Sequence, residues 1–161
     1  HQDSHVQLSN DAGLLLTGGH YKKLTVVASS SASASSTKGK NDIDKIDVFN
    51  EGRKIRFDDT YKKEGVNINF VEVASDNSLC KVRTYERGVE DETLSCGTGA
   101  IAVAVVLNYS NIVSKKEIKI SMKGGDLNVS FDRVGDNFSN IWLSGVVSEV
   151  YKGEINGDIK R

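Results

Sequence analysis

Residues 94–107 read Leu-Ser-Cys-Gly-Thr-Gly-Ala-Ile-Ala-Val-Ala-Val-Val-Leu, an apolar run behind a glycine-containing turn that begins at Cys96. Alanine occupies three of the eight positions in residues 100–107, which favours a helix over a strand. Because apolar residues lie on every side of that helix, we expect it to be buried all round. It is far too short to span a bilayer. The stretch therefore predicts a core helix around which the rest of the chain is folded.

The start of this helix is a candidate anion site. The first backbone N–H groups of a helix lack intrahelical partners, and the positive end of the helix dipole favours a carboxylate there. The same end favours a thiolate, which makes Cys96 a candidate reactive thiol beside the amides of Gly97 and Thr98. In the alternative interpretation, Cys96 is a small buried hydrophobic residue and the glycines only permit a tight turn.

Two strands precede the helix in the predicted order. Residues 66–70 alternate and run on to Val73, and they place Asn67 and Asn69 on the face opposite the apolar side chains. An asparagine both donates and accepts hydrogen bonds, which suits a ligand carrying ammonium and carboxylate groups. A strand with one solvated face is the alternative interpretation.

The second strand is residues 79–85, and it contains Cys80, for which we expect a structural role. Glu86 and Arg87 follow it. The planar guanidinium of an arginine matches a carboxylate through two bonds, although a Glu-Arg pair at a strand end is also common on protein surfaces. The acidic run at residues 90–92 reads as a solvated loop without a role.

The remaining pattern predicts the rest of an α+β fold, with a mixed, mostly antiparallel curled sheet around the central buried helix. Residues 118–122 and 127–131 alternate around a Lys-Gly-Gly-Asp turn, which indicates a hairpin. The other expected elements are a helix at residues 48–55 and two strands at residues 140–143 and 146–151, joined at Ser144-Gly145.

The N-terminal part, residues 1–40, gives a weaker pattern than residues 41–161, which read as the main domain. Residues 5–8 and 14–16 could pair as a hairpin. The run of serine and alanine at residues 29–36 is of low complexity and predicts a flexible loop.

Composition excludes several classes of protein. The 161 residues fit one domain, and 21 Lys and Arg against 22 Asp and Glu give no basic field for nucleic acid or an anionic membrane. With no signal peptide or transmembrane run, we expect a cytoplasmic protein whose two cysteines are reduced thiols. No Cys/His spacing suits zinc, so no metal is expected.

The motif around the helix start resembles a known family. Residues 83–88, Arg-Thr-Tyr-Glu-Arg-Gly, running into residues 94–100 resemble the second catalytic half of diaminopimelate epimerase. Residues 65–72, Gly-Val-Asn-Ile-Asn-Phe-Val-Glu, resemble the family's asparagine-containing strand. The resemblance runs from about Asn41 to about Ile155. It implies a fold in which each half of the enzyme wraps a sheet around a central helix.

The resemblance also implies an activity. The family inverts the α-carbon of diaminopimelate, a lysine and peptidoglycan precursor, with two cysteines and without a metal or pyridoxal cofactor. Cys96 then looks like one acid/base and Glu86 like a neighbour that tunes the thiol. The amides of Gly97 and Thr98 would hold the reacting carboxylate.

By the same resemblance, Asn67 and Arg87 would bind the distal amino-acid end of the substrate. Residues 17–21, Thr-Gly-Gly-His-Tyr, resemble the family's turn with an active-site histidine, which makes His20 a further candidate. A surface loop histidine is the alternative.

The family's other cysteine lies on its own Cys-Gly-Asn-Gly turn, in an N-terminal half that this sequence lacks. Cys80 is not at a helix start and cannot replace it. Three hypotheses follow: a half that acts with a complementing N-terminal half, a homodimer that brings two Cys96 residues to one cavity, or a non-catalytic binding or folding module. Another two-half isomerase, of the proline-racemase or phenazine-biosynthesis type, is the alternative enzyme.

Overall fold

The computed structural model describes residues 43–63, 65–74, 77 and 79–154, together with the backbone of three N-terminal strands. Those strands are β1 (Val6–Gln7), β2 (Tyr21–Ala28) and β3 (Ala32–Ser35). The helical elements are the 3-10 helix η1 (Ile43–Lys45), α1 (Val48–Arg56) and α2 (Gly97–Tyr109). The remaining strands are β4 (Asn67–Ala74), β5 (Cys80–Glu86), β6 (Asp91–Thr93), β7 (Glu117–Met122), β8 (Gly125–Val134) and β9 (Asn137–Gly145).

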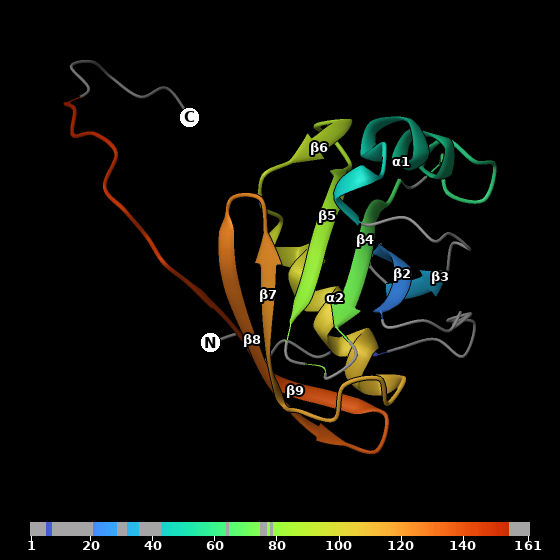
Figure 1. Cartoon of the computed structure of the whole chain (residues 1–161), viewed down its shortest axis with the longest axis vertical. Coiled ribbons are helices and arrows are strands. Elements are labelled where there is room, and N and C mark those ends of the chain that lie inside the picture. The colour runs from blue at the N-terminus through green and yellow to red at the C-terminus, as the bar shows by residue number, and fades with distance from the viewer. Residues whose placement is uncertain are drawn as a thin grey trace.

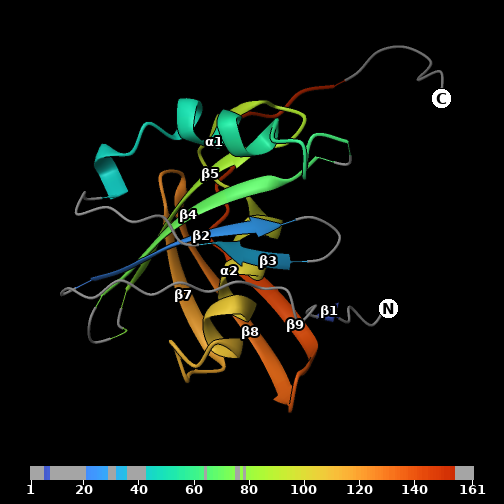
Figure 2. The same cartoon turned by 90° about the vertical axis from the view of Figure 1, so that its right-hand side faces the viewer.

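The described strands form one sheet in the order β1-β9-β8-β7-β5-β4-β2-β3, with β6 paired to β5. Neighbouring strands are antiparallel except for β5 and β7, which are parallel. Figure 1 shows the sheet curling around α2, and Figure 2 shows β2 and β3 continuing it beyond β4. The predicted α+β fold, a mostly antiparallel curled sheet around a buried helix, is therefore confirmed.

Helix α2 is the core element that the sequence predicts. Eight of its thirteen residues are buried, and side chains from β4, β5, β7, β8 and β9 surround it. Val103, Ala104 and Val105 each have no exposed surface. A helix buried on several sides needs apolar residues around its whole circumference, which is what residues 100–107 provide.

A second, smaller core lies on the other face of β4 and β5, under α1 (Figure 1). Asp47 caps α1 by accepting a hydrogen bond from the Asn50 amide at 3.1 Å. Gly52 packs against Tyr85, where a Cβ would lie 2.5 Å from the Tyr85 Cβ. Strand β4 is consequently buried on both faces, so the face that carries Asn67 and Asn69 is not solvated.

Several local predictions are confirmed. The helix expected at residues 48–55 is α1, the strands expected at 66–73 and 79–85 are β4 and β5, and the predicted hairpin is formed by β7 and β8. Cys80 begins β5 and is 3% exposed.

The prediction for the end of the chain is wrong. Strand β9 continues through Ser144-Gly145, because both residues pair with β8, and no break occurs at the predicted joint. Residues 146–151, predicted as a strand, are extended but unpaired and run away from the sheet (Figure 1). Val146 is 97% exposed and Tyr151 is 86% exposed.

The N-terminal predictions also need correction. Residues 32–35, part of the serine and alanine run predicted as a loop, form β3 and pair with β2. Val6 and Gln7, in one arm of the predicted hairpin, pair with β9. Residues 14–16, the other arm of that predicted hairpin, lie outside the described residues.

Candidate active site

Cys96 lies at the N-cap of α2, as the sequence predicts. The backbone there is extended, and the sulfur accepts a hydrogen bond from the Gly99 amide at 3.4 Å. The Cys96 carbonyl accepts the Ala100 amide at 2.9 Å, which closes the first turn. Cys96 is 4% exposed, so the sulfur is enclosed and held by the end of the helix that carries positive partial charge.

The amides of Gly97 and Thr98 are the first two of the helix. Since Gly99 and Ala100 donate to Cys96, these two are the N–H groups of the first turn that remain for a ligand among the described residues. The Thr98 hydroxyl lies 3.5 Å from the sulfur. A small carboxylate bound to the two amides would therefore lie next to the thiol.

Asn67 joins the sulfur to the end of β5. Its side-chain Nδ2 donates to the Cys96 sulfur at 3.8 Å, and its Oδ1 accepts the Arg87 amide at 2.8 Å. The Arg87 guanidinium donates to the Gly65 carbonyl at 3.5 Å. The structure thus gathers Asn67, Arg87 and Cys96, and it places the Asn67 amide against the thiol itself.

Glu86 and His20 complete the predicted set. Glu86 is half-buried at the end of β5, but the hydrogen-bond partners of the sulfur among the described residues are Asn67, Thr98 and Gly99. Tuning of the thiol by Glu86 stays a prediction. His20 lies outside the described residues.

The acidic run at residues 90–92, for which the sequence predicted no role, helps to hold the segment before Cys96 in place. Arg83 donates two hydrogen bonds to the Glu92 carboxylate, at 2.6 and 2.7 Å, and Lys123 donates one to the same carboxylate at 2.9 Å. Burial acts to raise the pKa of Glu92, but these cations outweigh it and hold that pKa below its ordinary value. Interpretation of residues 90–92 as a solvated loop is therefore wrong.

Three further hydrogen bonds hold the same segment. Glu90 accepts bonds from Arg56 at 3.2 Å and from the Tyr85 hydroxyl at 3.3 Å. The Gly124 amide donates to the Leu94 carbonyl at 2.6 Å, and a Cβ on Gly124 would lie only 3.0 Å from that oxygen. Glycine at this turn of the β7–β8 hairpin lets it approach the residues just before the thiol.

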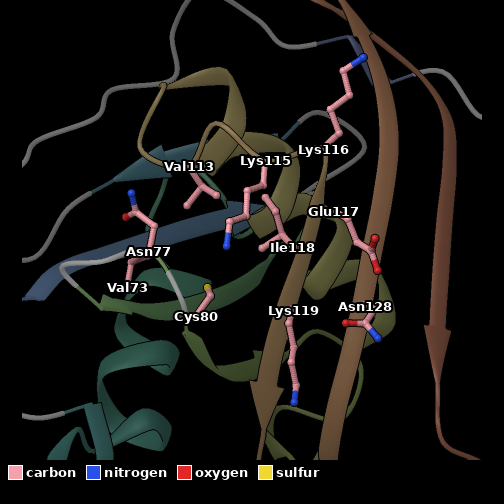
Figure 3. A pocket seen from close by; sticks show the side chains of 10 residues that line it. All are labelled: Val73, Asn77, Cys80, Val113, Lys115, Lys116, Glu117, Ile118, Lys119 and Asn128. Carbon is pink, nitrogen blue, oxygen red and sulfur yellow. The ribbon is translucent and has the colours of Figure 1, made fainter.

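Cys80 lies near the opposite end of α2. It helps to line a cavity of about 480 Å³ together with Lys115 and Val113, which follow the helix (Figure 3). Burial raises the pKa of the Cys80 thiol to about 12. No predicted site residue lines this cavity, so it is distinct from the Cys96 site.

Both cysteines are free thiols. Among the described residues, no three His, Cys, Asp or Glu side chains gather as metal ligands would. The described helices include none that could span a membrane.

The fold is an α+β domain whose core helix starts at an enclosed cysteine, with the Asn67 amide beside the sulfur. Residues 40–150 match the family model for diaminopimelate epimerase. The chain belongs to the diaminopimelate epimerase family.

Individual relatives agree with that assignment. The chain is 45% identical to a diaminopimelate epimerase of Flavobacterium psychrophilum over 115 residues, which are 71% of this chain and 44% of the relative. It is 39% identical to one of Aquifex aeolicus over 119 residues, 73% of this chain and 41% of the relative. It is 48% identical to one of Thermotoga maritima over 85 residues, which are 53% of this chain and 32% of the relative. The chain thus spans less than half the length of these relatives.

Proposed function

We propose that this chain supplies one cysteine half-site of an amino-acid epimerase that inverts the α-carbon of LL-diaminopimelate. The observation that carries the proposal is the Cys96 sulfur at the start of α2, beside the amides of Gly97 and Thr98. The names of the relatives support the substrate.

The proposed reaction uses two thiols and no cofactor. A cysteine thiolate takes the α-proton, so that the C–H bond breaks, an S–H bond forms, and the electron pair delocalises into the carboxylate. The amides of Gly97 and Thr98 hold that carboxylate as its charge grows. A second thiol then gives its proton to the opposite face of the carbon. Cys96 is one of the two groups, while Asn67 and Arg87 bind the distal amino-acid end.

In this proposal a complementing N-terminal half supplies the second cysteine, as the resemblance to the family implies. This chain spans 44% or less of the length of the first relatives. Apolar side chains near the start of α2 are exposed, which supports such a partner: Leu94 is 68% exposed, and Leu143, whose Cδ2 would lie 2.9 Å from a Cβ on Gly97, is 40% exposed. A twofold pair of these chains is the alternative partner. The two free cysteines suit a cytoplasmic location.

Hydrogen exchange tests the proposal. LL-diaminopimelate is incubated in deuterated water with the chain alone, and with the chain plus the N-terminal half of the Flavobacterium psychrophilum relative. We expect inversion with deuterium incorporation in the mixture, loss of both in Cys96→Ala, and retention of both in Cys80→Ala. No deuterium in either incubation would instead identify a non-catalytic module, and turnover by the chain alone that depends on its concentration would identify the homodimer.

The same assay with proline tests the proline-racemase type of two-half isomerase. The Arg-Thr-Tyr-Glu-Arg-Gly stretch at residues 83–88 favours diaminopimelate, so we expect no exchange with proline.

A further inference from the structure

Beneath the start of α2 lies a pair of polar side chains from the two central strands. Asn69 of β4 has no exposed surface, and Thr84 of β5 is 1% exposed. The two residues are partners in the β4–β5 register, and the Thr84 hydroxyl donates to Asn69 Oδ1 at 2.8 Å. This bond fixes the orientation of the Asn69 amide group.

The Asn69 amide oxygen meets the helix at Gly99. A Cβ on Gly99 would overlap Asn69 Oδ1, and it would lie 3.3 Å from the Cys96 sulfur. Because Gly99 has no side chain, the first turn of α2 rests directly on that oxygen. The distance of Gly99 from β4 therefore sets the direction of the Gly99 N–H group, which donates to the Cys96 sulfur.

We infer that Asn69 and Thr84 form a positioning pair for the Cys96 thiol. One face of β4 then positions two hydrogen-bond donors to the sulfur. Asn67 donates to the sulfur directly, and Asn69 sets the position of the Gly99 amide that also donates to it. That the placement of this sulfur serves proton transfer rests on the function proposed above. The pair acts on the sulfur through the Gly99 amide, so the role that we infer is positioning and not catalysis.

Alkylation of the two cysteines in the folded chain tests the inference. The chain is treated with a small excess of iodoacetamide at neutral pH, and the rates at Cys96 and Cys80 are read by peptide mass spectrometry. Thr84→Val keeps the shape of the side chain but removes the hydroxyl. A misplaced Gly99 amide stabilises the thiolate less, so we expect alkylation of Cys96 to slow about three- to tenfold with no change at Cys80.

Three variants separate positioning from simple loss of stability. Thr84→Ser keeps the donor and should restore the rate at Cys96. Val82→Ala deletes buried methyl groups from the same strand, and opening of the core should raise the rates at both cysteines or leave both unchanged. Thr84→Ala replaces Thr84→Val if the latter does not fold, and it should likewise slow Cys96.

Faster alkylation of both cysteines in Thr84→Val, or an unchanged rate at Cys96, would overturn the inference. The assay contains no substrate. Failure of the exchange reaction with diaminopimelate would therefore count against the proposed function without affecting this result.

Discussion

Replacement of Glu92 by glutamine should destabilise the chain more than its surface position suggests. Glu92 accepts two bonds from Arg83 and one from Lys123, and its side chain is 17% exposed while that of Arg83 is 10% exposed. Glu92→Gln keeps the shape of the side chain but leaves the Arg83 guanidinium facing a neutral amide.

The expected cost follows from the degree of burial. Breaking a fully buried ion pair costs about 3–5 kcal/mol. Here both side chains keep some contact with water, and the glutamine oxygen still accepts one bond from Arg83. The expected loss is therefore about 1.5–3 kcal/mol in the free energy of unfolding. With a urea dependence of about 1–3 kcal/mol per molar, the unfolding midpoint should fall by about 1 M.

Urea unfolding followed by far-ultraviolet circular dichroism measures this loss. Glu51→Gln is the matched control, because Glu51 pairs with Lys54 at 2.6 Å and both side chains are at least half exposed. That control should change the free energy of unfolding by less than about 0.5 kcal/mol. Equal effects of the two substitutions would refute the claim that Arg83 and Glu92 brace the segment before Cys96.

The remaining predictions concern pH and packing. Burial acts to raise the pKa of Glu92, but Arg83 and Lys123 lower it below the ordinary 4.5. The ion pairs of Glu92 therefore stabilise the fold above about pH 4.5, and this contribution is lost as the pH falls through the lower pKa of the folded state. Glu92→Gln should flatten the acid limb of a stability profile measured by urea unfolding. Burial raises the pKa of Cys80 from 9.0 to about 12, so stability should fall with pH across that interval, and Cys80→Ala should remove this alkaline slope in the same profile. Gly52→Ala should lower the free energy of unfolding by about 1–3 kcal/mol, measured in urea, because its methyl group overlaps Tyr85.

The parts that sequence predicts well are those that local chemistry determines. Helix α2 follows from eight consecutive apolar residues rich in alanine, and its start follows from the Gly-Thr-Gly sequence after Cys96. Strands β4 and β5 follow from alternation and turn residues. Each of these signals lies within about ten residues of the element that it specifies.

The missed features depend on partners far along the chain. From the sequence alone Glu92 is interpreted as a solvated residue, because its partners Arg83 and Lys123 lie 9 and 31 residues away along the chain. Residues 146–151 have the composition of a strand, but a strand needs a neighbour, and none of the described strands pairs with them. Asn67 is predicted as a site residue from the resemblance of its strand to the family, but its bond to the Cys96 sulfur appears only in three dimensions.

The placement of buried polar side chains also bears on the role of the Cys96 site. Among the described residues, four polar side chains are buried: Asn69, Glu72, Thr84 and Asn108. Glu72 and Asn108 bond to backbone groups that would otherwise lose a partner on burial. The bond between Asn69 and Thr84 links two side chains. The pair lies directly beneath Gly99, where a Cβ would overlap Asn69 Oδ1, and this is the position from which it can hold the first turn of α2, and with it the thiol, in place.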